Sequence, residues 1–158
     1  MKRFAIVLGL AVMLPLAAAA ECASVSAGDL TVTGAWSRAT IGTARPAVFY
    51  VEIRNDGETG DRLTGIDTPV AAMPMLHRTV VKDGVASMPH AEAIDIPAGE
   101  TVSLAPGGYH GMLMELTAPL AEGGTFPVAL RFERAGSVEI DARVLSIRAQ
   151  GAGCDAAG

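Results

Sequence analysis

The chain has 158 residues, of which 50% are hydrophobic and 18% charged, with 12 basic and 17 acidic side chains. This length fits a single domain of ordinary size. The acidic balance and the lack of any Lys/Arg cluster exclude the electrostatic surface on which binders of nucleic acid and anionic membranes depend, and they suit a positively charged protein partner or a soft cation.

The N-terminus has the features of a secretory signal. Lys2 and Arg3 precede the apolar run FAIVLGLAVMLPLAAAA, which is about as long as the shortest membrane span. Pro15 and the alanine-rich end favour cleavage after Ala20, so we predict a signal peptide over residues 1–20 and an exported, periplasmic protein with no stable membrane insertion afterwards. Cleavage removes two of the twelve basic residues and no acidic one, which gives the mature chain a net charge of −7.

The two cysteines, Cys22 and Cys154, lie near the two ends of the mature chain. Export implies an oxidising compartment. Two alternatives remain open: a disulfide that ties the ends together, if the termini lie close, or two free thiols in frayed tails. Cys22 also raises the question of a lipoprotein anchor, but Glu21 stands where such a signal has a small residue.

Beyond a short lead-in at 21–29, the chain shows short alternating or β-branched runs separated by Gly, Pro, Asn and Asp, and no helical periodicity. Seven to nine strands are expected, spaced as in an antiparallel β-sandwich. We predict one all-β domain over residues 30–147 and a flexible tail at 148–158. The runs that carry the strands are LTVTGAW, AVFYVEIRN, DRLTGIDT, MLHRTVVKDGVASM, IDIPAGETVSLAPGGYHGMLMEL and TFPVALRFERAGSVEIDARVLSI.

Histidine and methionine are confined to one part of the mature chain. All three histidines fall within 34 residues, and the methionines outside that part, Met1 and Met13, belong to the signal peptide. Methionines that only fill gaps in a core should be scattered over all strands. Core packing is the alternative for any single residue, whereas the joint pattern indicates a metal site. The residues concerned are Met73, Met75, His77, Met88, His90, His110, Met112 and Met114.

Strand geometry relates these residues to one another. Alternate residues of a strand share a face, about 6.6 Å apart, so His110 and Met112 point the same way; Met114 lies too far along to join them without a bend. If Asp83-Gly84 forms a two-residue turn, Met88 becomes the diagonal neighbour of His77 on one face. The pairs that this turn predicts are Lys82 with Val85, Thr79 with Met88, and His77 with His90.

The ligand types select the metal. Imidazole with thioether and no carboxylate indicates copper, above all Cu(I), whereas zinc prefers cysteine, histidine or carboxylate. A blue-copper electron carrier needs a cysteine ligand, and Cys22 and Cys154 lie far outside the His/Met segment. No Gly-x-Ser-x-Gly motif is present and the acidic residues are spread evenly, so nothing in the sequence indicates an enzyme.

The spacing of four of these residues is distinctive: His77, ten residues, Met88, twenty-one residues, His110, one residue, Met112. Together with TGAWSRAT, AVFYVEIRNDG, RLTGIDTPVAA and APGGYHGMLMEL, it resembles the periplasmic copper chaperone family (PCuAC type) that supplies copper to cytochrome c oxidase. The resemblance runs from about Leu30 to Ile147. It implies an antiparallel Greek-key β-sandwich of the cupredoxin-like kind and a surface-exposed Cu(I) site made by His77, Met88, His110 and Met112.

The resemblance also implies partners. A monomer of this kind hands its ion to a copper-accepting oxidase subunit, alongside a thioredoxin-like assembly factor. Some members carry a His/Met-rich tail that holds Cu(II), and because no His or Met follows Ile147 we expect no such second site here.

His90 is either a labile fifth ligand for Cu(II) or a surface histidine. Trp36, near Arg38, either shields the metal or packs in the core between the sheets.

Two other functions compete with delivery of copper. A copper-sequestering or resistance protein would use the same ligands without an acceptor. A metal-free exported β-sandwich interaction module would use the methionines as an adhesive patch.

Overall fold

The structure is a computed structural model that describes residues 22–154, and those residues contain strands but no helix. The predicted signal peptide at 1–20 and the last four residues of the predicted tail lie outside this range. Within it, no helix is long and apolar enough to cross a membrane. The strands are β1 (Ser24–Ala27), β2 (Leu30–Arg38), β3 (Ala47–Asn55), β4 (Asp61–Asp67), β5 (Ala71–Arg78), β6 (Val80–Lys82), β7 (Val85–Ser87), β8 (Ile94–Ile96), β9 (Thr101–Leu104), β10 (Tyr109–Leu116), β11 (Thr125–Phe132) and β12 (Gly136–Leu145).

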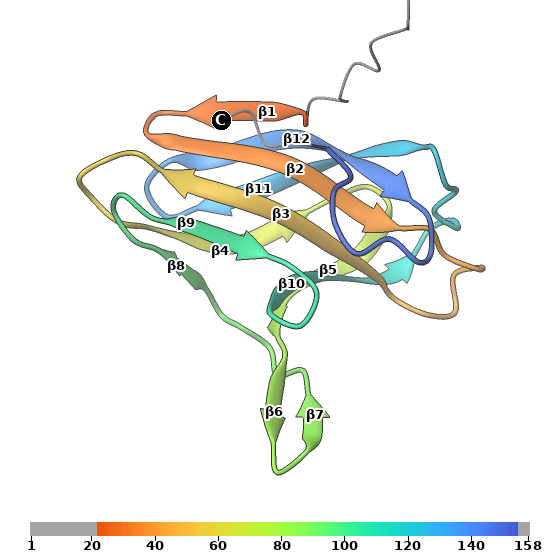
Figure 1. Ribbon diagram of the computed structural model, residues 1–158. Coiled ribbons are helices and arrows are strands. Elements are labelled where there is room, and N and C mark those ends of the chain that lie inside the picture. Colours follow the sequence, from red (N-terminus) through yellow and green to blue (C-terminus); the bar gives the residue numbers. More distant parts are fainter. Residues whose placement is uncertain (1–21, 155–158) are drawn as a thin grey trace, which may run out of the picture.

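One sheet contains every strand except the β6–β7 hairpin, in the order β5-β10-β9-β3-β2-β12-β11-β4-β8, with β1 added on β2 and a second contact between β10 and β3. The sheet curls over itself so that its two halves face each other (Figure 1). The predicted all-β sandwich is therefore confirmed. The sheet is mixed rather than wholly antiparallel, because β12 lies parallel to β2 and β10 meets β9 in a parallel pair.

The core forms where the inner faces of the two halves meet. In β11, the buried residues Phe126, Val128, Leu130 and Phe132 alternate with residues that face outward, as the two-residue period of a strand requires. In β3 the same alternation turns Phe49 inward. In β4, Leu63 and Ile66 are three residues apart and both face inward because the pairing of β4 with β11 shifts by one residue between them. Each of the three side chains is almost fully buried. Burial of a side chain of this size contributes about 1.5–3 kcal/mol.

The ends of the described chain are joined. Cys22 and Cys154 form a disulfide with Cα atoms 5.3 Å apart, so the first of the two alternatives for the cysteines is correct. The predicted lead-in contains β1, which pairs with β2. In the segment predicted as a tail, the Ala149 carbonyl accepts a 2.7 Å hydrogen bond from Nε of Arg38. Specific contacts thus extend beyond the domain limits expected from the sequence.

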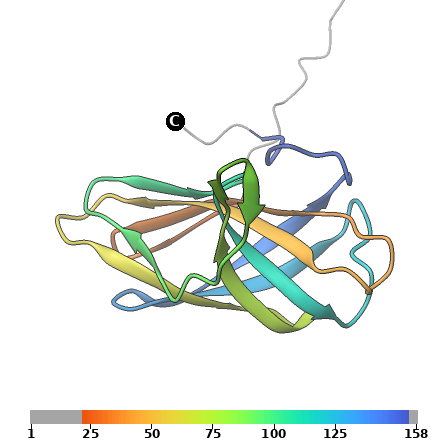
Figure 2. The same cartoon turned by 90° about the horizontal axis from the view of Figure 1, so that it is seen from below.

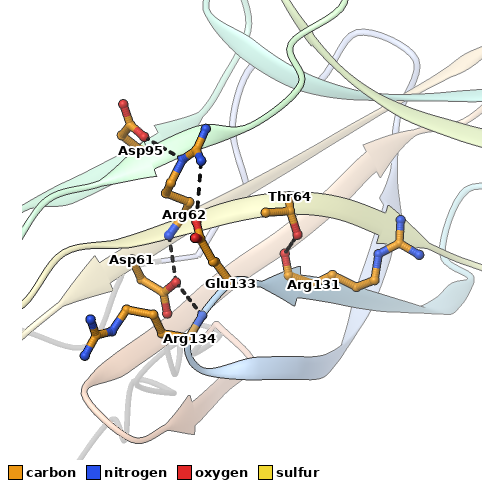
Figure 3. A network of polar contacts seen from close by, with 7 residues as sticks. All are labelled: Asp61, Arg62, Thr64, Asp95, Arg131, Glu133 and Arg134. Atoms are coloured by element: carbon orange, nitrogen blue, oxygen red, sulfur yellow. Dashed lines mark hydrogen bonds and ion pairs between the residues drawn. The ribbon is translucent and has the colours of Figure 1, made fainter.

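A polar network fixes the β11–β12 turn at the half of the sheet that carries β4 and β8 (Figure 3). Asp61 is only 8% exposed. Its carboxylate accepts hydrogen bonds from the backbone N–H groups of Arg62, at 2.7 Å, and of Arg134 and Ala135, at 2.9 Å. Arg62 also forms ion pairs with Asp95 and Glu133, but these are exposed and contribute little.

The β6–β7 hairpin stands away from the sandwich. Figure 1 shows it projecting from the end of β5, and Figure 2, seen from below, shows β5 and β10 on the same side of the molecule as the hairpin. The hairpin forms its own two-stranded sheet. The side chains of this hairpin are therefore mostly exposed, while the residues at its base adjoin the main sheet.

Candidate metal centre

Six of the eight histidines and methionines singled out by the sequence lie on β5 and β10, whereas Met88 and His90 follow the β6–β7 hairpin. The two strands pair antiparallel with His110 opposite His77 and Met112 opposite Met75. Leu76 and Leu113, on the alternate positions, are buried in the core. Because alternate residues of a strand point to opposite faces, His77, His110 and Met112 share the face that points away from the core.

Gly111 explains how β10 can lie so close to the opposite half of the sandwich. A Cβ atom at this position would lie 2.7 Å from Cδ1 of Ile66 and 3.0 Å from Cδ1 of Phe49. No side chain fits there without displacement of its neighbours. The glycine between His110 and Met112 thus sets the depth of β10 and, with it, the height of both side chains above the sheet.

One ring nitrogen of His110 lies at hydrogen-bonding distance from a backbone carbonyl group. The residue is only 3% exposed, and its Nδ1 lies 3.1 Å from the carbonyl oxygen of Gly108. When Nδ1–H donates this bond, Nε2 keeps its lone pair free, as in metal-ligating histidines whose other nitrogen is fixed by a carbonyl. The Gly108 oxygen also accepts the N–H of Thr79 at 3.0 Å.

His77 carries an unsatisfied buried nitrogen. Its Nδ1 is buried and has no hydrogen-bond partner, a situation that costs about 1–3 kcal/mol unless a partner is supplied. Its ring centre lies 6.0 Å from that of His110 and 5.9 Å from that of His90. Burial lowers the pKa of His77 below its usual 6.5, and the neighbouring imidazoles of His110 and His90 lower it further. A neutral imidazole with an unused lone pair suits a cation.

The predicted hairpin register is confirmed. Lys82 pairs with Val85, and His77 forms a bridge with His90. Asp83 and Gly84 have φ angles of 52° and 78°, the positive values that a two-residue hairpin turn of this type needs. By the same register Met88 falls opposite Thr79, on the face of His77, and it is 51% exposed.

Among residues 22–154, no three His, Cys, Asp or Glu side chains are grouped so that they could hold a metal ion by themselves. The three imidazoles therefore do not complete a site alone, and any soft-metal site on this face needs thioethers as well. Met112 lies on the same strand face as His110, and Met88 directly follows β7 and is half-exposed. His90 is exposed, with its ring edge-on to His77.

Met75, like Met73 and Met114 farther along this face, was not assigned to a ligand pair by the sequence reasoning. It lies directly opposite Met112. It belongs to the confined methionines, but only the pairing of β5 with β10 brings it beside the histidines. Strands joined through 30 residues of intervening chain give no local signal of their register.

Trp36 is buried by packing, as predicted, with 4% of its surface exposed, but it packs on the outer face of the sheet rather than between its two halves. Phe49 and Val51 face the core, hence Tyr50 between them faces outward. Trp36 pairs with Tyr50 on the adjacent strand, with ring centres 4.6 Å apart, and the guanidinium of Arg38 lies 5.7 Å from each ring. This aromatic cluster lies on the same side of the sheet as His110, one strand away.

Comparison with known proteins identifies the family of this chain. Residues 30–144 match the family described as "Putative lipoprotein LpqE-like". A protein described as "Putative lipoprotein Lxx21020", from Leifsonia xyli subsp. xyli, is 41% identical over 132 residues, which are 81% of this chain and 77% of that protein.

Solved structures show the same fold. The copper-bound PCuAC domain from PmoF2 is 27% identical with a TM-score of 0.68, over 78% of this chain and 98% of that domain. The apo PCuAC domain from PmoF1 gives the same identity and TM-score. The solution structure of CuI-DR1885 from Deinococcus radiodurans is 32% identical with a TM-score of 0.59, over 72% of this chain and 76% of that one.

The curled sheet is that of a PCuAC-type domain. Within that class, the chain belongs to the LpqE-like family. The resemblance seen in the sequence is thereby confirmed.

Proposed function

We propose that this protein is an exported copper chaperone that binds one Cu(I) through His77, Met88, His110 and Met112. The observation that carries the proposal is the pairing of His77 with His110 on the outer sheet face, where Nδ1 of His77 is buried without a partner. A bound ion would satisfy that nitrogen. The copper-bound PmoF2 domain supports copper as the metal, and CuI-DR1885 supports Cu(I).

The donor set favours Cu(I) over other biological metals. Thioethers are soft and bind hard cations weakly, and the site has neither the cysteines nor the carboxylates that zinc prefers. The lowered pKa of His77 keeps that imidazole neutral near pH 7. Because two imidazoles and two thioethers are neutral ligands, the bound site keeps the single positive charge of the ion.

Release would begin at the exposed ligand. Met88 is half-exposed on a projecting hairpin, so an acceptor can replace this thioether first and then the others, one at a time. We propose a copper-accepting subunit of cytochrome c oxidase as the acceptor, with a thioredoxin-like assembly factor as a second partner. The mature net charge of −7 would favour approach of a cationic acceptor or of the ion itself.

We place this activity in the periplasm, reached through a cleaved signal peptide at 1–20. The disulfide between Cys22 and Cys154 agrees with an oxidising compartment. The lipoprotein descriptions of the family and of the relative from Leifsonia xyli also agree with export.

The test is an anaerobic competition titration with Cu(I) against a chromophoric chelator, under conditions that leave the disulfide intact. The wild-type mature chain should withdraw one tight equivalent, and His110→Ala or Met112→Ala should weaken that equivalent by tenfold or more. His90→Ala is the matched control, an imidazole removed from the exposed side of His77. A wild-type chain that never competes with the chelator would favour the metal-free interaction module.

A genetic experiment separates delivery from sequestration. A deletion strain should lose cytochrome c oxidase activity and recover it when copper is added to the medium. If the deletion changes copper tolerance but not oxidase activity, the protein sequesters copper and the delivery proposal is wrong.

A further inference from the structure

The methionines continue beyond the proposed Cu(I) site in regular order. In the antiparallel pairing of β5 with β10, His77–His110 is followed by Met75–Met112 and then by Met73–Met114. The three pairs are separated by two residues on each strand, so all six side chains lie on one face of the sheet. Four of the five methionines of the mature chain thus form two adjacent cross-strand pairs.

The spacing allows the thioethers to meet. Directly opposite Cβ atoms lie about 4.5–5.5 Å apart, and diagonal neighbours about 7–8 Å apart, within reach of long side chains. Methionine has three rotatable side-chain bonds and adapts its sulfur position readily. Met73, Met75 and Met114 can therefore turn their sulfurs toward one point between the two strands.

These methionines do not serve the core. Leu76 and Leu113, on the inward positions of the same strands, fill it. Met73 is 39% exposed, and Met75 and Met114 are partly exposed. A row of apolar side chains on the outer face of the edge strand β5 and its neighbour β10 gains little from burial and invites aggregation, so packing does not account for their grouping.

We infer that Met73, Met75 and Met114 form a second, all-thioether site for a soft monovalent cation, Cu(I), beside the first. The inference rests on the proposed function, since the first site defines the cargo. Three thioethers without imidazole or carboxylate select Cu(I) and its analogue Ag(I) against Cu(II), zinc and hard ions. Met112 lies between the two sites, opposite Met75 and next to His110, so an ion can pass from one site to the other through its sulfur.

The experiment uses the disulfide-intact mature chain with 13C-labelled methionine methyl groups, titrated with Ag(I), which needs no reductant. The wild type should take up two equivalents by native mass spectrometry. The first should shift the methyl signals of Met88 and Met112, and the second those of Met73, Met75 and Met114. The double variant Met73→Leu/Met114→Leu keeps apolar volume and should bind the second equivalent at least tenfold more weakly while the first is unchanged.

Two further variants separate the sites. His110→Ala should weaken the first equivalent and leave the Ag(I)-dependent shifts of Met73 and Met114 in place. Met73→Leu alone changes only the most exposed of the three side chains, and it should weaken the second equivalent even if the double variant folds poorly. A wild type that saturates at one equivalent, or a second equivalent that survives in Met73→Leu unchanged, overturns the second site. A wild type that lacks the tight equivalent at Met88 and Met112 but still takes up Ag(I) at Met73, Met75 and Met114 refutes the proposed function instead.

Discussion

Gly111 lies between two of the proposed ligands, and replacing it should disturb both stability and metal binding. In Gly111→Ala the new Cβ would stand 2.7 Å from Cδ1 of Ile66 and 3.0 Å from Cδ1 of Phe49. Overpacking of a close-packed core costs about 1–3 kcal/mol. Alanine also lowers the conformational entropy of the unfolded chain, which stabilises the folded state by about 0.4–1 kcal/mol. We therefore expect a net loss of about 1–2 kcal/mol in the free energy of unfolding.

Urea denaturation of the apo protein, followed by tryptophan fluorescence, measures this loss. The strain is relieved by outward movement of β10, which carries His110 and Met112 with it. Cu(I) affinity should accordingly fall by about tenfold, or about 1.4 kcal/mol.

A double-mutant cycle tests the cause. Ile66→Val removes the Cδ1 atom that lies nearest to the new methyl group, and alone it should cost about 0.5–1.5 kcal/mol. Since the two changes relieve one contact, Gly111→Ala/Ile66→Val should be more stable than the sum of the single effects predicts. Additive effects, or a Gly111→Ala variant as stable as the wild type with full Cu(I) affinity, would refute the reasoning.

Other perturbations give equally definite expectations. The lowered pKa of His77 means that the unfolded chain binds a proton more readily than the folded one, so apo stability is complete above about pH 6.5 and falls as the pH drops below it; His77→Asn should flatten this part of the curve in pH-dependent urea melts. Cys22→Ser/Cys154→Ser removes a disulfide that spans a sequence separation of 132. Chain entropy predicts a loss of about 5 kcal/mol in the free energy of unfolding, and removal of native disulfides typically costs about 2–5 kcal/mol. Thermal melting of this variant beside the wild type checks the loss, and an unchanged Tm would contradict it. Asp61→Ala leaves three backbone N–H groups without their acceptor and should cost about 2 kcal/mol or more, with Cu(I) affinity unchanged because Asp61 lies in the other half of the sheet.

The sequence was sufficient where structure is local. The Asp83-Gly84 turn fixes the register of its own hairpin, because few turn types connect two strands through two residues. Hence the bridge between His77 and His90 followed from the turn alone. The alternation within each strand likewise predicted that His110 and Met112 share a face.

Pairing between distant strands was not predictable in this way. Nothing near β5 indicates that β10 is its neighbour, so the row of cross-strand pairs that begins at His77 could not be read from the chain. Trp36 shows a second limit. Its size suggested the core, yet the outer face of the sheet buries it equally well against Tyr50. Burial follows from the contacts a residue finds, and those depend on strand order.

One peptide group connects the exposed hairpin to the buried imidazole. The carbonyl oxygen of Gly108 accepts the N–H of Thr79, at the base of the hairpin, and also lies against Nδ1 of His110. Both of its lone pairs are therefore engaged. A protein that binds and moves the hairpin would strain the first bond, and a displacement of Gly108 would alter its contact with the His110 ring. Binding of an acceptor at the tip of the hairpin would therefore change the orientation of Nε2 of His110. This change would let the acceptor weaken the hold on the ion as it binds.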